Sequence, residues 1–357
     1  MTTDHGFPAD RAALTRRLFP DGVPALWSPT LVFYDEAGNI DRDRLLAHLG
    51  FMAPCVKGIL VPGSTGDAWE MRDEEAIAAL DIAIDFAAPR GLDLLAGVLR
   101  PSAEAMRALL DKLLEHLRRR TGMGSIADCF AAARVRGVTI AAPSSAAPLP
   151  QEAIGAALEP LFALGLPMAL YQLPQVTGNT MSPDLVAGLA RRFPNLLLFK
   201  DSGGADEVAL SGRMPAGVTL LRGAEGDYAH WSKAHGGPYD GFLLSTANAF
   251  PAQLAAVLDD LQHGRVEEAE RRSAAVSAAV ADAFAAVAEV PQGNAFTNAN
   301  KALAQVMAYG NDALWALPPR LYAGGHLPRP VMEWVVASLG RHGLLPERGY
   351  LQEQLLR

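Results

Sequence analysis

Short apolar segments recur along the chain, and each is followed by a longer segment with helical spacing. Eight of these segments are apolar nearly throughout: 25–33, 58–63, 92–98, 137–143, 166–172, 195–200, 218–223 and 240–246. Continuous apolar runs, as opposed to alternating ones, are typical of parallel strands that are covered on both faces. The pattern therefore predicts eight buried parallel strands.

Helical periodicity fills the intervals between these strands, most clearly at 73–88, 102–120 and 182–193. The last of these begins with Ser182 and Pro183, a capping residue followed by proline at the first helical position. Repeated strand–helix alternation is the signature of a (β/α)8 TIM barrel, an α/β fold. A doubly wound open sheet is the alternative, but it needs a glycine fingerprint after its first strand, which SPTLVFYDEAGN does not supply.

The pattern divides the chain into three regions. Residues 1–23 form an N-terminal extension that we expect to cap the closed end of the barrel, and residues 24–250 form the barrel itself. Residues 251–357 form a C-terminal helical region, in which 258–290, 296–310 and 329–343 are predicted as three helices. Within the barrel, residues 120–137 are predicted to add a short extra helix.

Composition narrows the possible classes of protein. Of the 357 residues, 50% are hydrophobic and 20% are charged, and the net charge is −8, which argues against nucleic-acid or anionic-membrane partners. The two cysteines have no CxxC spacing, which is typical of a reducing compartment. No segment has the pattern of a signal peptide or a membrane span, so the prediction is a cytoplasmic protein.

One predicted strand ends in a lysine. In NLLLFKDSGG, residues 195–204, an apolar run leads directly into Lys200 before the chain turns polar. Active sites of such barrels lie at the C-terminal ends of the strands. A lysine at a dry barrel mouth loses hydration of its charged form, so we expect its pKa below the usual value of ~10.4. The neutral amine can then attack a ketone and form an imine.

Two other strand ends carry groups that suit this chemistry. Tyr171 lies at the end of the preceding strand, and its phenol can carry protons beside the amine. The GSTG turn after the second strand supplies Ser64 and Thr65, and closely approachable N–H groups there can hold a small carboxylate. Together these residues predict a site for a 2-oxo acid, with its carboxylate on the turn and its ketone carbon at Lys200.

Four motifs resemble those of the dihydrodipicolinate synthase / N-acetylneuraminate lyase family of Schiff-base class I aldolases and lyases. GSTGD at 63–67 is similar to the family's GTTGE, YQLP at 171–174 to its YNxP, and KDSGG at 200–204 to its imine-lysine motif KDSSG. STANAFP at 245–251 resembles the segment after the last strand. The likeness runs in order from about residue 24 to the C-terminal helices.

The resemblance implies roles for individual residues. Lys200 would form the imine, Tyr171 would relay protons, and Ser64 would hand protons onward. Ser64 and Thr65 would also bind the pyruvate-like carboxylate. Backbone atoms would line the pocket at two further positions, Gly223 and Leu243. The resemblance further implies a homodimer or homotetramer.

Two departures from the family pattern concern the second substrate. Val176 stands where the synthase branch carries an arginine that grips a second carboxylate. Ser144 and Ser145 replace paired tyrosines, one of which completes a proton relay across the dimer interface. We therefore expect Val176 and Ser145 to contact a substrate other than that of a lysine-biosynthesis synthase, with an apolar or hydroxylated distal end.

The predicted function is a Schiff-base lyase or aldolase that acts on pyruvate or a related 2-oxo acid and an aldehyde. An imine-dependent dehydratase or hydratase-aldolase is an alternative, as is a non-catalytic barrel that binds a small oxo acid. Glu225 and Asp227, which follow the seventh strand, are candidate contacts to a polar substrate tail, whereas Asp201 is predicted to cap a turn. His230 and His235 are spaced awkwardly for one helical face, so we expect neither a metal nor another cofactor.

Overall fold

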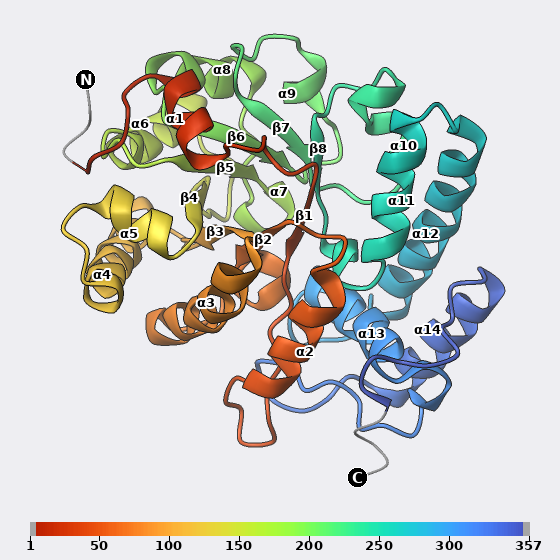
Figure 1. Ribbon diagram of the computed structural model, residues 1–357. Helices are drawn as coiled ribbons and strands as arrows, with labels where there is room; N and C mark the ends of the chain where they lie inside the picture. The colour runs from red at the N-terminus through yellow and green to blue at the C-terminus, as the bar shows by residue number, and fades with distance from the viewer. Residues whose placement is uncertain (1–4, 353–357) are drawn as a thin grey trace.

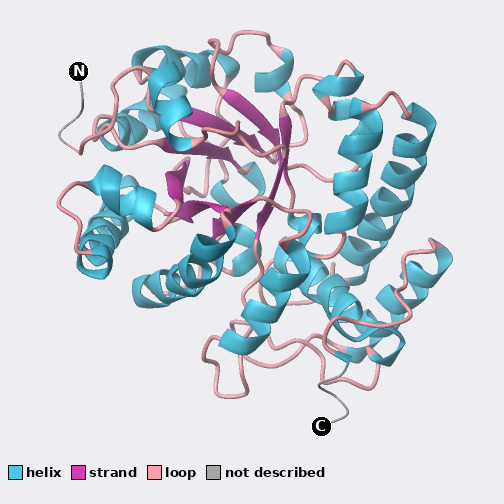
Figure 2. Cartoon of the chain, in the orientation of Figure 1, coloured by secondary structure: helices cyan, strands magenta, loops and turns pink. Residues whose placement is uncertain are grey.

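Eight parallel strands close into a barrel, which confirms the predicted (β/α)8 fold (Figure 2). The computed structural model describes residues 5–352. The strands pair in chain order, and β1 closes the barrel against β8. Their bounds are β1 Leu26–Pro29, β2 Gly58–Val61, β3 Asp93–Gly97, β4 Val135–Ala141, β5 Met168–Gln172, β6 Leu196–Asp201, β7 Thr219–Arg222 and β8 Gly241–Leu243.

Helices surround the strands on all sides (Figures 1 and 2). Up to β8 they are α1 Arg11–Leu18, α2 Arg42–Met52, α3 Asp73–Ala87, α4 Ala103–Thr121, α5 Ile126–Ala132, α6 Gln151–Phe162, α7 Pro174–Thr177, α8 Pro183–Arg192, α9 Glu207–Leu210 and α10 Tyr228–Trp231. Nearly every strand residue is buried, because the helices cover one face of each strand and the barrel interior covers the other. This two-sided burial explains why the strand sequences do not alternate.

The helix boundaries follow the capping residues. The Ser182 side chain accepts a hydrogen bond from the N–H of Leu185, and Pro183 opens α8, as predicted. The extra helix expected within 120–137 is α5, whose cap is the Ser125 side chain. α1 lies over the N-terminal ends of the strands, where the Arg11 guanidinium donates to the carbonyls of Phe193 and Leu196. α1 thus lies against the closed end of the barrel.

The C-terminal region is helical, as predicted, but its first helix is divided. The helices are α11 Pro251–Gln262, α12 Val266–Ala286, α13 Ala295–Tyr309 and α14 Arg329–Arg341. The break within 258–290 falls at Gly264, whose φ of 72° ends α11, so the prediction of one continuous helix there is wrong. Arg265 then pairs with Asp260 across the turn. A lone glycine in an otherwise helical pattern was the available signal.

The C-terminal helices share one hydrophobic core with the barrel. The same buried cluster contains Trp27 of β1, Val276 of α12 and Val335 of α14. In Figure 1, α13 runs beneath the barrel's lower strands while α11 and α12 stand along one side. The division of the chain at residues 23 and 250 stays a prediction. Among the described residues, no helix is both long and apolar enough to cross a lipid bilayer.

Candidate active site

Lys200 lies near the carboxyl end of β6, in register with Tyr171 of β5 and Leu221 of β7. Only 3% of the lysine is exposed. Its Nζ lies 4.0 Å from the centre of the Tyr171 ring, at cation–π distance. Strand register therefore brings the two predicted residues side by side inside the barrel mouth.

The amine of Lys200 is buried without an acidic partner. Within residues 5–352, no carboxylate lies within ion-pair distance of its Nζ. Burial lowers the pKa of Lys200 to about 7, because removal of water disfavours the ammonium form. The negative charge of Glu225 acts in the opposite direction and raises this pKa. A substantial fraction of the amine is thus neutral near pH 7, as a nucleophilic lysine requires.

Gly223 leaves the space that the lysine side chain occupies. A Cβ at this position would lie 2.7 Å from Cε of Lys200 and 3.2 Å from the carbonyl oxygen of Leu243, and closer still to the Ser202 hydroxyl. Any larger residue would therefore collide with the lysine. Gly223 and Leu243 both contribute backbone atoms next to Lys200, where they were predicted to line the pocket.

Tyr171 connects the lysine to two hydroxyl groups. Burial raises the pKa of Tyr171 to about 12, while hydrogen bonding to the Ser202 and Ser64 side chains opposes the shift. The phenol is therefore protonated near pH 7 and can act as a proton donor. Ser202 was not predicted as a site residue, although it lies in the KDSGG motif just two positions after Lys200.

The GSTG turn forms a buried 3-10 helix, Ser64–Gly66, directly above β2. Ser64 and Thr65 are each 3% exposed. The indole N–H of Trp69 donates to Ser64 Oγ at 2.7 Å, so Trp69 anchors this turn. The Thr297 hydroxyl from α13 donates to the Ser64 carbonyl at 3.1 Å. The C-terminal region thereby fixes a turn that lies more than 230 residues earlier in the chain.

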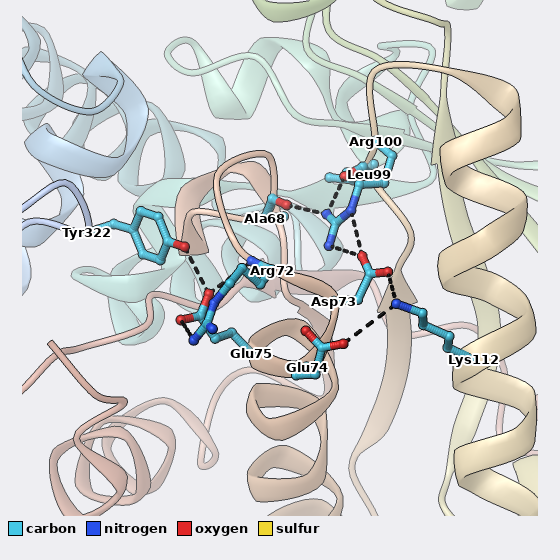
Figure 3. A network of polar contacts seen from close by, with 9 residues as sticks. All are labelled: Ala68, Arg72, Asp73, Glu74, Glu75, Leu99, Arg100, Lys112 and Tyr322. Carbon is cyan, nitrogen blue, oxygen red and sulfur yellow. Dashed lines mark hydrogen bonds and ion pairs between the residues drawn. The ribbon is translucent and has the colours of Figure 1, made fainter.

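A network of charged residues holds the chain that follows the turn (Figure 3). The guanidinium of Arg100, after β3, donates to the carbonyl oxygens of Ala68 and Leu99 and to the Asp73 carboxylate. Asp73 also pairs with Lys112 of α4 at 2.8 Å. These bonds join the loop after β2 to the end of β3, which positions the turn against its neighbouring strand.

A second buried ion pair supports the same turn from the other side. Nζ of Lys301 in α13 lies 3.0 Å from Asp67 Oδ2, and the Tyr34 hydroxyl donates to that oxygen at 3.0 Å. Asp67 adopts a positive φ of 60° as it ends the 3-10 helix. Lys301 was not among the predicted site residues, because nothing in its local sequence pattern distinguishes it from a surface lysine of a helix.

Glu225 lies at the barrel mouth and accepts four hydrogen bonds. Its Oε1 accepts from Ser245 Oγ at 2.6 Å and from the Thr246 N–H at 3.1 Å. Its Oε2 accepts from the Tyr228 hydroxyl at 2.9 Å and from Thr246 Oγ1. The STAN segment, singled out only by resemblance, thus holds this carboxylate in place.

The remaining predicted residues lie at the rim. Val176 in α7 packs against the apolar cluster that contains Tyr171. The Ser145 hydroxyl donates to the Ala147 carbonyl and accepts from the Asn179 side chain, which ties the loops after β4 and β5 together. Asp201 Oδ1 accepts a hydrogen bond from the Gly203 N–H at 2.8 Å and so caps a turn, as expected.

Metal-ligating side chains do not gather at this site. Across residues 5–352, no group of three His, Cys, Asp or Glu side chains is arranged to hold a metal ion. His230 and His235 do not belong to the cluster around Lys200. His235 instead faces Glu270 of α12. Among the described residues, those around Lys200 include a phenol, hydroxyls and the Glu225 carboxylate.

Comparison with known proteins agrees with this arrangement. Residues 161–292 match the Dihydrodipicolinate synthetase family. The chain is 26% identical to a 4-hydroxy-tetrahydrodipicolinate synthase of Methanosphaerula palustris over 71% of this chain and 79% of that protein. It is also 26% identical to a protein of Emericella nidulans named as a probable mitochondrial 4-hydroxy-2-oxoglutarate aldolase, over 72% of this chain and 79% of that protein.

The fold is likewise shared with a solved structure. YagE, a prophage protein of E. coli K12 solved in complex with pyruvate, superimposes with a TM-score of 0.69 at 19% identity, over 90% of this chain and 98% of that one. The sequence match spans β5 to α12 and so includes Tyr171, Lys200 and Gly223. The sequence match, the relatives and the barrel therefore make this chain similar to the dihydrodipicolinate synthetase family, with the family match itself confined to residues 161–292.

Proposed function

We propose that this chain is a class I aldolase or lyase that forms a Schiff base between Lys200 and pyruvate or a related 2-oxo acid. The match of residues 161–292 to the dihydrodipicolinate synthetase family and the names of the two relatives support an enzyme of the lyase type. The observation that carries the finer proposal is the Lys200 amine, which is buried, has no ion-pair partner within residues 5–352 and has a pKa lowered to about 7. A buried lysine in this state is a nucleophile.

The first step is addition of the amine to the ketone. The lone pair of Nζ forms a bond to the ketone carbon, and the amine proton passes to the ketone oxygen through the Tyr171 phenol. The Tyr171 phenol then protonates that oxygen, which leaves as water, so that a protonated imine and a phenolate remain. Tyr171 suits this traffic because it is hydrogen bonded to Ser64 and Ser202, which connect it to further proton carriers.

The carboxylate of the 2-oxo acid would lie on the turn at Ser64 and Thr65. The turn is held rigid by Trp69 and Thr297, so its donors need little reorganisation when a ligand binds. The protonated imine then withdraws electrons from the neighbouring carbon, whose proton passes to the Tyr171 oxygen to leave an enamine. The enamine carbon attacks the aldehyde carbon, and the aldehyde oxygen takes a proton back from the Tyr171 phenol. In the reverse direction, the same electron sink accepts the electrons of a breaking carbon–carbon bond.

Reductive trapping tests this proposal. Borohydride in the presence of pyruvate should convert the imine to a stable secondary amine, and peptide mass mapping should locate the adduct at Lys200. The variant Lys200→Met should give no adduct under the same conditions. An adduct that forms equally well in this variant, or unmodified Lys200 with every 2-oxo acid tried, would sink the proposal and favour a barrel that binds oxo acids without imine chemistry.

A further inference from the structure

One side of the barrel mouth is apolar. A small cluster separate from the main core gathers at the carboxyl ends of β2 to β5, and its buried members are Ala68, Leu99, Ala141, Tyr171 and Leu173. Trp69, Val176 and Phe296 pack against it and are only partly buried. Because Tyr171 belongs to this cluster and also contacts Lys200, the apolar surface begins at the amine itself.

Two aromatic residues extend this surface from different parts of the fold. Phe296 comes from the start of α13 and makes an edge-to-face contact with Phe284 of α12, with ring centroids 5.5 Å apart. Trp69 is fixed by its hydrogen bond to Ser64. The apolar wall is therefore built from rigid, anchored side chains, which suits recognition of an apolar ligand group.

The opposite side of the mouth carries a negative charge. Glu225 follows β7, and its field reaches both Lys200 and Tyr171, whose pKa values it raises. Four donors surround the carboxylate, which leaves it little capacity to bind further donors. A second carboxylate on a substrate would therefore meet a like charge here.

Three cations next to the loops of the mouth are already paired. Arg100 is bound to Asp73, and Lys301 to Asp67. Arg222 pairs with Asp206 through Nε at 3.0 Å and also donates to the carbonyls of Ala224 and Gly226. None of these three guanidinium or ammonium groups is free to balance an anionic substrate tail.

Building on the proposed function, we propose that the second substrate is an uncharged aldehyde with an apolar chain or ring, and that the site discriminates against aldehydes bearing a carboxylate. Val176 and Phe296 select the apolar body, and Glu225 repels the anion. Such a preference would differ from that of an enzyme whose substrate carries two carboxylates, such as 4-hydroxy-2-oxoglutarate, which appears in the name of one relative.

Longer 2-oxo acids test the proposal, because the atoms beyond carbon 3 of an aldol product come from the aldehyde. Borohydride trapping at Lys200 is measured with pyruvate as reference and with three probes: 2-oxohexanoate, 2-oxoglutarate and the 5-methyl ester of 2-oxoglutarate. The ester and 2-oxoglutarate differ in charge and little in shape. We expect 2-oxohexanoate and the ester to be trapped at least about tenfold more efficiently than 2-oxoglutarate.

The outcomes separate the two proposals. If pyruvate is trapped and 2-oxoglutarate is trapped as well as or better than 2-oxohexanoate and the ester, the substrate inference is overturned and the proposed imine chemistry stands. Trapping with pyruvate and with none of the longer acids overturns it as well. Failure with pyruvate removes the proposed function, and the substrate inference falls with it.

Two substitutions sharpen the test. Glu225→Gln removes the like charge and should narrow the preference for the ester over 2-oxoglutarate. Val176→Arg adds a cation at a partly buried position and should reverse that preference, whereas the neutral variant Val176→Gln should not. If the ratio of trapping efficiencies for the ester and 2-oxoglutarate stays unchanged in both Glu225→Gln and Val176→Arg, these residues are not specificity determinants.

Discussion

Among residues 5–352, two lysines are buried, and the main difference in their surroundings is a neighbouring carboxylate. Lys200 is 3% exposed and Lys301 is fully buried, and each lies over a tyrosine ring, Tyr171 at 4.0 Å and Tyr34 at 4.6 Å. Lys301, however, has the Asp67 carboxylate 3.0 Å away, while Lys200 has no such partner among the described residues. Burial, aromatic contact and residue type are shared, so the paired carboxylate is what separates the two.

The difference shows how the same side chain becomes structural or reactive. An ammonium paired with a buried carboxylate keeps its charge and cannot act as a nucleophile at neutral pH. An ammonium buried without a partner loses protons readily, because nothing replaces its hydration. We therefore expect Lys200 to provide chemistry and Lys301 to provide the position of the GSTG turn.

Activity should distinguish the two lysines most strongly. Lys200→Met removes the nucleophile and should lower turnover by at least about a thousandfold and abolish imine trapping. Lys301→Met should retain trapping with pyruvate in whatever fraction remains folded, since Lys301 does not contact the amine. The measurement is trapped adduct per folded protein, and equal losses in the two variants would break the comparison.

Replacement of the two lysines by methionine should change the stability of the folded protein in opposite directions. Lys301→Met leaves Asp67 buried without its cation and should lower the free energy of unfolding by about 3–5 kcal/mol. Lys200→Met removes a buried group whose pKa is lowered on folding, and should raise the free energy of unfolding by roughly 4 kcal/mol near and below pH 7. Each unit of pKa shift corresponds to about 1.4 kcal/mol.

This gain depends on pH with a definite sign. The pKa of Lys200 is about 7 in the folded chain and near 10.5 in the unfolded chain. Between these values the unfolded chain binds more protons, so the wild-type protein becomes more stable as pH rises and the advantage of Lys200→Met fades. Urea denaturation of the wild-type protein and of Lys200→Met at pH 6.5 and pH 9.5 measures this difference in the free energy of unfolding. A difference in favour of the variant that grows with pH would contradict the lowered pKa of Lys200.

The two tyrosines provide the next test. Tyr171→Phe keeps the ring over Lys200 but removes the proton carrier, so turnover should fall by about 10²-fold or more. Tyr34→Phe removes one hydrogen bond to Asp67, and we expect a loss of stability of about 1–3 kcal/mol with little change in turnover. Steady-state kinetics together with thermal denaturation of both variants would separate these roles.

The smallest expected effect concerns the pH profile. Trapping with pyruvate requires the neutral amine, so its rate should rise about tenfold per unit below pH 7 and level off above it. Glu225→Gln removes a charge that raises the pKa of Lys200, so its profile should shift to lower pH. A profile that still rises at pH 9, or that moves to higher pH in the variant, would contradict this account.

Part of the site follows from short stretches of sequence. Lys200 and Tyr171 each end an apolar run, and parallel strands deliver their carboxyl ends to one rim, so their proximity follows from strand order. The GSTG turn is recognisable from its own composition. Ser202 could have been predicted by the same reasoning, since it lies two positions after Lys200, where β6 ends.

The contacts that complete the site could not be predicted in this way. Lys301 reaches Asp67 across 234 positions, and Thr297 reaches Ser64 across 233. In the sequence, Lys301 is one lysine in an amphipathic helix, and which face of that helix meets the barrel depends on how the C-terminal region docks. Gly264 likewise divides a helix only because the chain turns back there to pack α12 against α11.

By itself, the sequence determined the eight strands, their order and the chemical groups at their ends, because hydrophobic period and strand-end position are local properties. The tertiary structure alone decided which buried lysine has an acidic partner, and which sides of the mouth are apolar and anionic. Both depend on packing between segments distant in the chain, where desolvation and charge pairing are set by neighbours that no local pattern specifies.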